Sequence, residues 1–315
     1  MKLRSLLLIA LVAVVFCGCH SYQPTSITVA SYNLRNANGS DSAKGNGWGQ
    51  RYPVIAKMVQ YHDFDIFGTQ ECFIHQLKDM KEALPGYDYI GVGRDDGKEK
   101  GEHSAIFYRT DKFDVIEKGD FWLSETPDMP SKGWDAVLPR ICSWGHFKCK
   151  DTGFEFLFFN LHMDHIGKKA RVESAFLVQD KMKELGKGKE LPAILTGDFN
   201  VDQTHQSYDA FVSKGVLCDS YEKADFRYAI NGTFNDFDPN SFTESRIDHI
   251  FVSPSFQVKR YGVLTDTYRS IVGKGEKKQA NDCPEEIDIK TYQARTPSDH
   301  FPVKVELEFD QRQQK

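Results

Sequence analysis

Stretches of β-forming residues alternate along the chain with segments of helical spacing. Residues 27–34 are rich in β-branched and aromatic side chains and place Asn33 where a core strand would end. The apolar positions of 53–61 recur at helical spacing, and the short strand predicted over 65–71 ends at Glu71. By the same criteria we predict an amphipathic helix over 168–185 and strands over 87–92, 104–108, 113–123, 140–148, 155–162, 191–195, 247–252 and 302–309.

The order of these elements indicates an α/β fold. Strand, helix and strand alternate near the start, whereas 140–148 and 155–162 are joined by a short turn that is typical of a β-hairpin. The chain has 315 residues, 40% of them apolar, and this content suffices for one large core. Because no change in composition divides the sequence, we expect one domain over 27–310, with mixed sheets covered by helices.

The first 19 residues have the composition of an export signal. A basic start precedes an uncharged run over 6–16, which is followed by Gly18 and Cys19. The run is too short for a permanent membrane helix, which needs about 20 apolar residues. We therefore predict a cleaved signal peptide over 1–19 and a polar linker over 20–26.

Gly18 followed by Cys19 resembles the lipobox of bacterial lipoproteins, although Phe16 is unusual at its position. The resemblance implies that Cys19 is lipidated and becomes the mature N-terminus. The lipid would anchor the exported protein in a membrane, facing the periplasm or the cell surface. Ordinary signal cleavage is the alternative, and it would give a periplasmic or secreted protein.

Charge and cysteine content narrow the possible functions. Removal of the leader leaves 38 basic and 45 acidic residues, a formal charge of −7, so a general polyanion-binding surface is not indicated. Beyond the leader the cysteines are odd in number and contain no Cys-x-x-Cys pair, which argues against a zinc knuckle or a full disulfide framework. We expect buried thiols at Cys72, Cys142, Cys149, Cys218 and Cys283.

Polar residues repeatedly fall at the ends of predicted strands. Taken singly they are weak evidence, because Asp and Asn after Gly commonly form turns and a lone His is usually structural. Their order along the chain carries more weight, since widely spaced acids, amides and imidazoles all follow apolar strands. The set consists of Asn33, Glu71, His162, Asp198, Asn200, Asp248, Asp299 and His300.

The motifs around these residues resemble the endonuclease/exonuclease/phosphatase superfamily over about 27–309. The superfamily includes deoxyribonucleases, sphingomyelinases, inositol-polyphosphate phosphatases and deadenylases. The resemblance implies a four-layer α/β sandwich of two mixed, mainly antiparallel sheets, as in deoxyribonuclease I. The matching pieces are Ser31-Tyr32-Asn33-Leu34-Arg35, Gln70-Glu71, Asn160-Leu161-His162, Gly197-Asp198-Phe199-Asn200, Arg246-Ile247-Asp248-His249-Ile250-Phe251 and Ser298-Asp299-His300-Phe301-Pro302.

The resemblance also implies a divalent cation. A phosphoester is anionic, so its hydrolysis requires an activated water and neutralisation of charge on the phosphoryl and leaving oxygens. Mg²⁺ is commonly held by one or two carboxylates and keeps several waters, so Glu71 can anchor it. Asn33 and Asp299 would complete or orient its shell. Mn²⁺ is a possible substitute.

Catalytic roles carried over from the family fall on four further residues. His300 resembles the imidazole of the terminal Asp-His pair, and Asp248 resembles the carboxylate that orients it and favours its charged form. Asp198 is the competing candidate for general base, or a ligand of a second metal. The Asn200 amide could donate to a phosphoryl oxygen. The sequence leaves this division of labour open.

Four positions complete the predicted site. His162 lies where the family has a second catalytic histidine, and Glu102 resembles the acid that pairs with it in the deoxyribonuclease branch. Arg140 could clamp a phosphate through its guanidinium, or it could form a surface salt bridge. Asn235 lies in a loop with which some branches contact substrate.

We therefore expect a metal-dependent phosphoric ester hydrolase, a phosphodiesterase or nuclease that works by in-line attack of water. The alternative is a phosphomonoesterase or a phospholipid or inositol phosphate hydrolase, which the acidic net charge favours. A catalytically silent, ligand-binding surface lipoprotein is the alternative of another class. Candidate substrates are nucleic acid, a sugar phosphate or a lipid headgroup, and no stable protein partner is indicated. The charged segment 268–296 is longer than an ordinary connection, and it could shape specificity or be a mobile loop.

Overall fold

The computed structural model describes residues 24–186, 191–271, 277, 284, 287, 289–310 and 312. The predicted signal peptide with Cys19, most of the linker 20–26 and Cys283 lie outside the described residues. Within them, no helix combines the length and the apolar character that crossing a membrane requires. The thiols of Cys72, Cys142 and Cys149 are free and buried, as expected, whereas that of Cys218 is free but only partly buried, because β9 lies at the edge of its sheet.

One sheet of the fold has seven strands. β1 pairs in parallel with β2 on one side and antiparallel with β15 on the other. β10 and β12 are also parallel, and the remaining neighbours are antiparallel. The strand order is β10 (Phe226–Tyr228), β12 (Gln257–Val263), β15 (Val303–Phe309), β1 (Thr25–Asn33), β2 (Ile66–Gln70), β4 (Ile106–Arg109) and β3 (Tyr87–Ile90).

The second sheet has six strands. β6 and β7 form the predicted antiparallel hairpin, with Cys142 opposite Leu161 and Lys148 opposite Glu155. β7 and β8 are parallel, and the other neighbours are antiparallel. The strand order is β5 (Phe113–Trp122), β6 (Ile141–Cys149), β7 (Glu155–His162), β8 (Ala193–Asp198), β11 (Asp248–Val252) and β9 (Cys218–Asp219).

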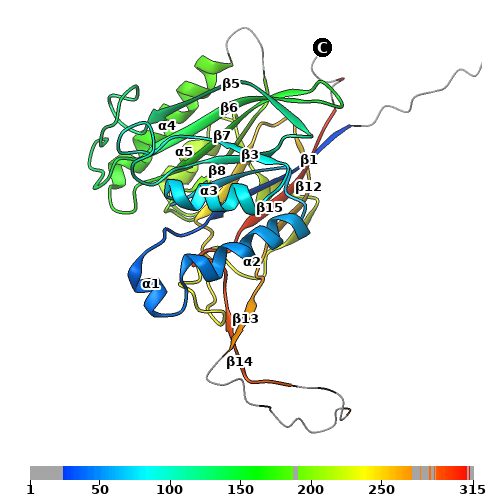
Figure 1. Cartoon of the computed structure of the whole chain (residues 1–315). Helices are drawn as coiled ribbons and strands as arrows, with labels where there is room; N and C mark the ends of the chain where they lie inside the picture. The colour runs from blue at the N-terminus through cyan, green and yellow to red at the C-terminus, as the bar shows by residue number, and fades with distance from the viewer. Residues whose placement is uncertain are drawn as a thin grey trace, which may run out of the picture.

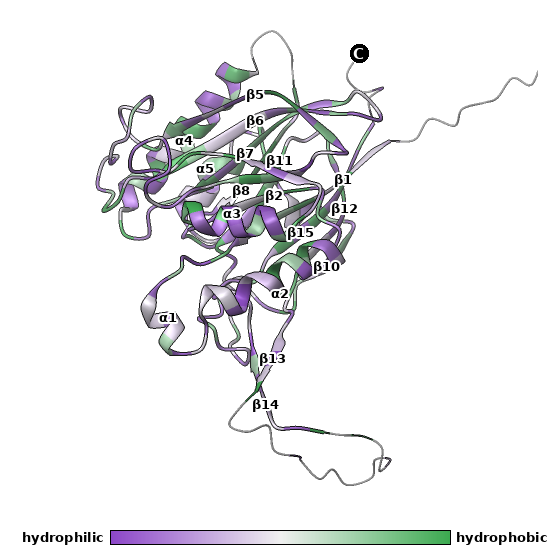
Figure 2. Cartoon of the chain, in the orientation of Figure 1, coloured by the Kyte–Doolittle hydropathy of each residue, from purple (hydrophilic) through white to green (hydrophobic). Residues whose placement is uncertain are grey.

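Helices cover the outer faces of both sheets and complete the expected four-layer sandwich (Figure 1). α2 (Trp48–Tyr61) and α3 (Ile74–Ala83) pack on the seven-stranded sheet, and α4 (Lys168–Leu185) and α5 (Gln206–Val212) pack on the six-stranded sheet. Figure 2 shows hydrophobic and hydrophilic residues mixed along α3 and α4, as expected for helices with one buried face. Two short helices are α1 (Gly39–Ala43) and α6 (Ser220–Lys223).

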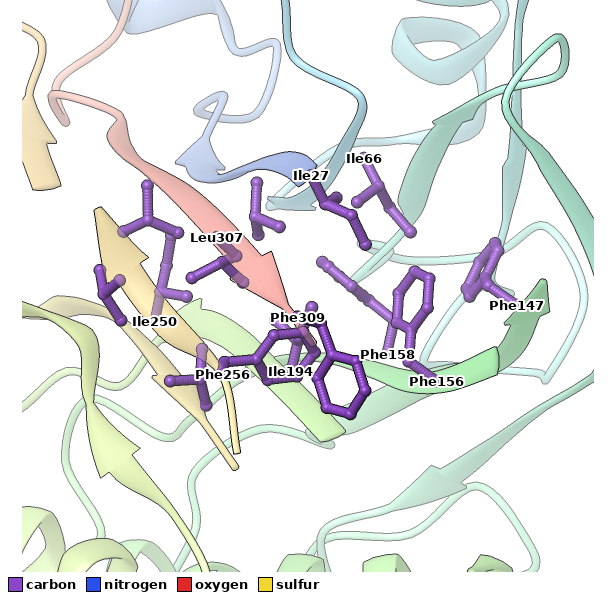
Figure 3. Close-up of a cluster of buried hydrophobic side chains, with 14 of the residues drawn as sticks. Ile27, Ile66, Phe147, Phe156, Phe158, Ile194, Ile250, Phe256, Leu307 and Phe309 are labelled. Carbon is purple, nitrogen blue, oxygen red and sulfur yellow. The ribbon is translucent and has the colours of Figure 1, made fainter. Parts of the chain in front are cut away.

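The main core lies between the two sheets (Figure 3). Ile27, Ile66 and Leu307 from the seven-stranded sheet belong to the same buried cluster as Phe158 and Ile194 from the six-stranded sheet. Each fully buried apolar side chain of this size contributes about 1.5–3 kcal/mol to folding. The alternating burial of β15, inward at every second residue, explains why its period predicted a strand.

A buried polar layer joins the sheets near one end of this core. Asn160 on β7 donates through Nδ2 to the carbonyl oxygens of Thr69 and Ala105, and its Oδ1 accepts from Gln70 Nε2 at 2.7 Å. Gly68 on β2 leaves room for this arrangement, because a Cβ there would overlap the side chains of Asn160 and Thr196. The layer therefore fixes the two sheets relative to each other.

Two of the predicted segments differ markedly in the structure, and α3, α5, β9, β10 and β12 were not predicted. α2 begins at Trp48 rather than at residue 53, so Pro53 lies inside it. Its first turn buries Trp48 and Arg51. Neither side chain is aliphatic, so the spacing of aliphatic residues did not reveal this turn. Part of 268–296 is not a loop but a two-stranded arm that projects from the body, formed by β13 (Tyr268–Ile271) and β14 (Tyr292–Arg295) (Figure 1).

Candidate active site

Strand order brings the predicted polar residues to one end of the sandwich. Because β1 and β2 are parallel, Asn33 and Glu71 emerge at the same edge of the seven-stranded sheet. In the other sheet β7 and β8 are parallel, and His162 pairs in register with Asp198. Asp248 is directly opposite Asp198 on the antiparallel neighbour β11. The two sheets thus contribute acids and amides to a shared site.

These residues surround a cleft of about 430 Å³. Asn33 and Asp248 have no exposed surface and lie beneath the cleft, while Asn235 is not among the residues that line it. The lining contains eight of the predicted site residues together with Arg35, Asn36, Leu138, His165, Phe234 and Ile247. The eight are Glu71, Glu102, Arg140, His162, Asp198, Asn200, Asp299 and His300.

Glu71 and Asp299 both line the cleft, and both approach the guanidinium of Arg35. Arg35 Nη1 lies 3.9 Å from Glu71 Oε2 and 3.4 Å from Asp299 Oδ2. Single ligand atoms of Glu71, His162 and Asp198 also lie within 4.8 Å of one another. Carboxylate oxygens at this spacing fit a hard divalent cation, which prefers oxygen ligands. The donor set therefore suits the expected metal.

Asn33 is placed to orient these carboxylates. Its Nδ2 donates to Glu71 Oε1 at 3.1 Å and to Asp198 Oδ2 at 2.9 Å. Its Oδ1 accepts from the backbone N–H of Arg35 at 2.9 Å. The amide oxygen is therefore turned away from the acids, and an amide nitrogen does not ligate a cation. Of the two expected roles, this geometry favours orientation over ligation.

His300 forms a buried ion pair with Asp248. Its Nδ1 lies 2.8 Å from Asp248 Oδ2, which leaves Nε2 toward the cleft, 3.8 Å from Asp198 Oδ2. Burial disfavours the imidazolium, but the carboxylates of Asp248 and Asp198 outweigh it and hold the pKa of His300 well above its ordinary value. The side chain is therefore a charged donor at neutral pH.

Asp198 and His162 have the opposite electrostatic character. Burial and the Asp248 carboxylate raise the pKa of Asp198 to about 7. Burial, reinforced by Arg140 and Arg94, holds the pKa of His162 well below its ordinary value. Asp198 is therefore poised to exchange a proton near neutral pH, whereas His162 is neutral.

Asn200 supports His162. Its Nδ2 donates to the backbone oxygen of Met163 at 2.9 Å and lies 3.1 Å from His162 Nε2. Because the carbonyl fixes the amide orientation, His162 Nε2 accepts and its proton is on Nδ1. In the described part of the chain, this Nδ1 has no hydrogen-bond partner.

The expected pairing of Glu102 with His162 is wrong. Glu102 lines the cleft, but its Oε2 accepts from Arg94 Nη1 at 2.6 Å and its Oε1 from Asn36 Nδ2 at 3.4 Å. Burial raises the pKa of Glu102, and Arg94 opposes that shift. Arg94 lies only eight residues before Glu102 in a tight loop. It therefore forms an ion pair with the carboxylate that the family resemblance had paired with His162.

The two predicted substrate-binding residues differ in placement. Arg140 lines the cleft and is buried, with Nε 3.3 Å from Asp164 Oδ2, so its salt bridge is internal and not on the surface. Its Nη1 has no hydrogen-bond partner among the described residues. Asn235 instead uses its Oδ1 to accept from Thr296 Oγ1, and the preceding Phe234 lines the cleft.

Sequence reasoning missed Arg35 and Arg51. Arg35 lines the cleft, while Arg51 is fully buried behind it. Arg35, Glu71 and Asn200 also adopt left-handed backbone with φ of 55°, 66° and 51°, a conformation that costs non-glycine residues roughly 1 kcal/mol or more. Such strain often marks functional sites. Arg35 belongs to the family motif at residues 31–35, and its positive charge was the signal that could have identified it as a phosphate-binding candidate.

Comparison with known proteins identifies the class. The sequence profile of the Endonuclease/Exonuclease/phosphatase family matches residues 30–300, and the chain belongs to this family. Enzymes of the family act on phosphoesters with divalent metal ions. The chain carries the acid and histidine cluster for that chemistry and is a phosphoester hydrolase.

Three similar proteins bear on the reaction. A solved family member from Bacteroides thetaiotaomicron is 85% identical over 94% of this chain and 99% of that chain, with a TM-score of 0.86. A structure described as a mannosyl-6-phosphatase of the same species is 86% identical over 90% of this chain and 100% of that chain, with a TM-score of 0.84. The Ccr4 exoribonuclease subunit of the CCR4-Not complex from Debaryomyces hansenii is 23% identical, over 81% of this chain and 35% of that protein.

Proposed function

We propose that the protein is a Mg²⁺-dependent phosphomonoesterase that removes the phosphate from a sugar phosphate, specifically the 6-phosphate of a mannosyl residue. The 86% identity to a protein described as a mannosyl-6-phosphatase carries this proposal. A cleft of about 430 Å³ accommodates a phosphorylated sugar. The acidic net charge of the chain further favours a small substrate over a long nucleic acid.

Glu71 and Asp299 would hold the cation, with Asn33 orienting Glu71. When bound, a divalent cation there neutralises charge on the phosphoryl group and lowers the pKa of a water. Mn²⁺ could replace Mg²⁺, because both accept octahedral oxygen ligands. The carboxylates give the cleft negative charge, and no lysine is among the described residues that line it.

The remaining residues divide the proton and charge chemistry. His300, kept charged by Asp248, would donate from Nε2 to a phosphoryl oxygen as negative charge develops. Asp198, with its pKa raised to about 7, would accept the proton of the attacking water. Arg140, which lines the cleft, would bind another phosphoryl oxygen.

A phosphodiesterase or nuclease is the second candidate. The similarity to the Ccr4 exoribonuclease subunit favours it, and the same acids and imidazoles serve either reaction. A catalytically silent binding protein is the third candidate. The complete set of acids and imidazoles around the cleft argues against silence.

A substrate panel distinguishes these functions. Purified protein lacking residues 1–19 is assayed with Mg²⁺ or Mn²⁺ against mannose 6-phosphate, inositol phosphates, sphingomyelin, single-stranded oligonucleotides and plasmid. We expect release of phosphate from mannose 6-phosphate, abolished in Glu71→Ala with an unchanged circular dichroism spectrum. Faster cleavage of oligonucleotides would favour the nuclease, and metal binding without any turnover would favour the silent protein.

We further propose that the chain is exported and anchored to a membrane through lipid on Cys19. The basic start, apolar run and Gly18-Cys19 pair support the proposal. Labelling of cells with an alkyne fatty acid should modify the wild-type chain but not Cys19→Ser. Equal labelling of both, or of neither, would reject lipidation at this residue.

A further inference from the structure

Arg35 presents a guanidinium to the cleft from the seven-stranded side. It follows β1, and its side chain is 32% exposed, in contrast to 4% for Arg140, which precedes β6 of the other sheet. Arg35 Nε lies 2.9 Å from Asp41 Oδ2. Its Nη1 lies 3.4 Å from Asp299 and 3.9 Å from Glu71, longer than a good N–H···O hydrogen bond of about 2.7–3.2 Å. The outer edge of the guanidinium therefore keeps donor capacity.

The backbone of Arg35 is held in place from behind. Its N–H donates to Asn33 Oδ1 at 2.9 Å, and its carbonyl oxygen accepts from Arg51 Nη2 and Gln76 Nε2, both at 3.0 Å. These contacts support its left-handed φ of 55°. A strained residue fixed by three neighbours holds its side chain at a defined place, which a flexible surface arginine does not.

Charge in the cleft makes this guanidinium important for a monoester. Four carboxylates line the cleft, and Arg35 and Arg140 are the two guanidinium groups among the described lining residues. A phosphomonoester enters as a dianion with three terminal oxygens, whereas a phosphodiester has a single charge and two such oxygens. Loss of one guanidinium therefore leaves the monoester with more uncompensated repulsion than the diester.

We propose that Arg35 is a specificity-determining residue that binds a terminal oxygen of the phosphomonoester dianion opposite Arg140, and so favours monoesters over diesters. This inference rests on the proposed phosphomonoesterase function. Arg35 would act as an additional hydrogen-bond donor from the loop after β1. The residues described above would still bind the cation and transfer the protons.

The test compares Arg35→Gln, Arg35→Lys and the control Arg260→Gln in the full chain with Mg²⁺. Arg260 lies on β12, and its side chain is 69% exposed. Values of kcat/KM are measured for mannose 6-phosphate and for bis(p-nitrophenyl) phosphate. We expect Arg35→Gln to lose about 10- to 100-fold on the monoester, as for loss of a hydrogen bond to a charged group, and less than about threefold on the diester. Arg35→Lys should recover part of the loss, and Arg260→Gln should match wild type.

Two binding measurements separate this role from a structural one. Inhibition by inorganic phosphate should weaken about tenfold or more in Arg35→Gln, while affinity for Mn²⁺, measured by calorimetry without substrate, should stay the same or increase. Equal losses on both ester classes, or weaker Mn²⁺ binding, would overturn the inference. Failure of the wild type to hydrolyse mannose 6-phosphate would instead reject the proposed function.

Discussion

Asp248 on the six-stranded sheet accepts a hydrogen bond from His300, which precedes β15 of the seven-stranded sheet, at 2.8 Å. Both side chains are almost fully buried, so this ion pair connects the two halves of the sandwich at the floor of the cleft. The pair fixes which nitrogen of His300 faces the substrate. It also gives the imidazole its charge.

Replacement of Asp248 by Asn should test this pairing. The variant keeps the shape of the side chain but removes the charge that raises the pKa of His300. We expect kcat/KM to fall about 10²- to 10⁴-fold. Because the charged imidazole is the active form, the alkaline limb of the pH–rate profile should move to lower pH. An unmoved limb would show that His300 does not act as the charged donor.

The same pair has a predictable effect on stability. A histidine whose pKa rises on folding stabilises the native state fully below its unfolded pKa of about 6.5. This contribution is lost as the pH rises through the raised folded pKa. Urea denaturation of wild type and Asp248→Asn should therefore show a stability difference that is largest below about pH 6.5. A difference that grows toward alkaline pH would contradict the assigned charge.

Gly68→Ala should loosen the contact between the sheets. A Cβ at residue 68 would overlap Asn160 Oδ1 and Thr196 Oγ1 in the buried polar layer. Overpacking of this kind costs about 1–3 kcal/mol in the free energy of unfolding. Gly49→Ala is the matched control, because nothing lies within 4 Å of its added Cβ and it sits in α2. Equal stability of the two variants, measured by urea denaturation, would reject this packing argument.

Arg51→Met should destabilise the loops that carry the site. Arg51 is fully buried and donates to four backbone oxygens, those of Leu34, Arg35, Asn46 and Pro297, at 2.7–3.0 Å. Its removal takes this donor from all four carbonyls, of which that of Arg35 keeps a bond from Gln76 Nε2, so we expect a loss of at least about 3 kcal/mol in unfolding free energy. The exposed Arg260→Met should change stability by less than about 0.5 kcal/mol. Losses of similar size would refute the proposed anchoring role.

Much of the site could be predicted from the sequence, because the ends of strands can be recognised where an apolar stretch gives way to a polar residue. The apolar stretches that end at Asn33, Glu71 and Asp198 become strands that converge at one edge of the sandwich. The family resemblance supplied the four-layer sandwich of two mixed, mainly antiparallel sheets. Periodicity alone had predicted a mixed α/β fold without its topology.

Other features depend on tertiary contacts that a linear pattern does not contain. Arg51 binds carbonyls from residues 34, 35, 46 and 297, which only the folded chain brings together. α3 was missed, although its apolar face is buried, because it has few aliphatic positions in a polar segment. The pairing of Glu102 failed for a related reason, since the nearer Arg94 competes for the carboxylate.

We propose that Glu71 and Asp299 hold a divalent cation in the shared cleft. Crystals soaked in Mn²⁺ and measured at its absorption edge test this claim most directly. We expect an anomalous peak about 2.0–2.2 Å from carboxylate oxygens of both residues, close to the octahedral distances of Mg²⁺. A fully occupied peak elsewhere, or no peak while both carboxylates remain free at millimolar Mn²⁺, would contradict the account.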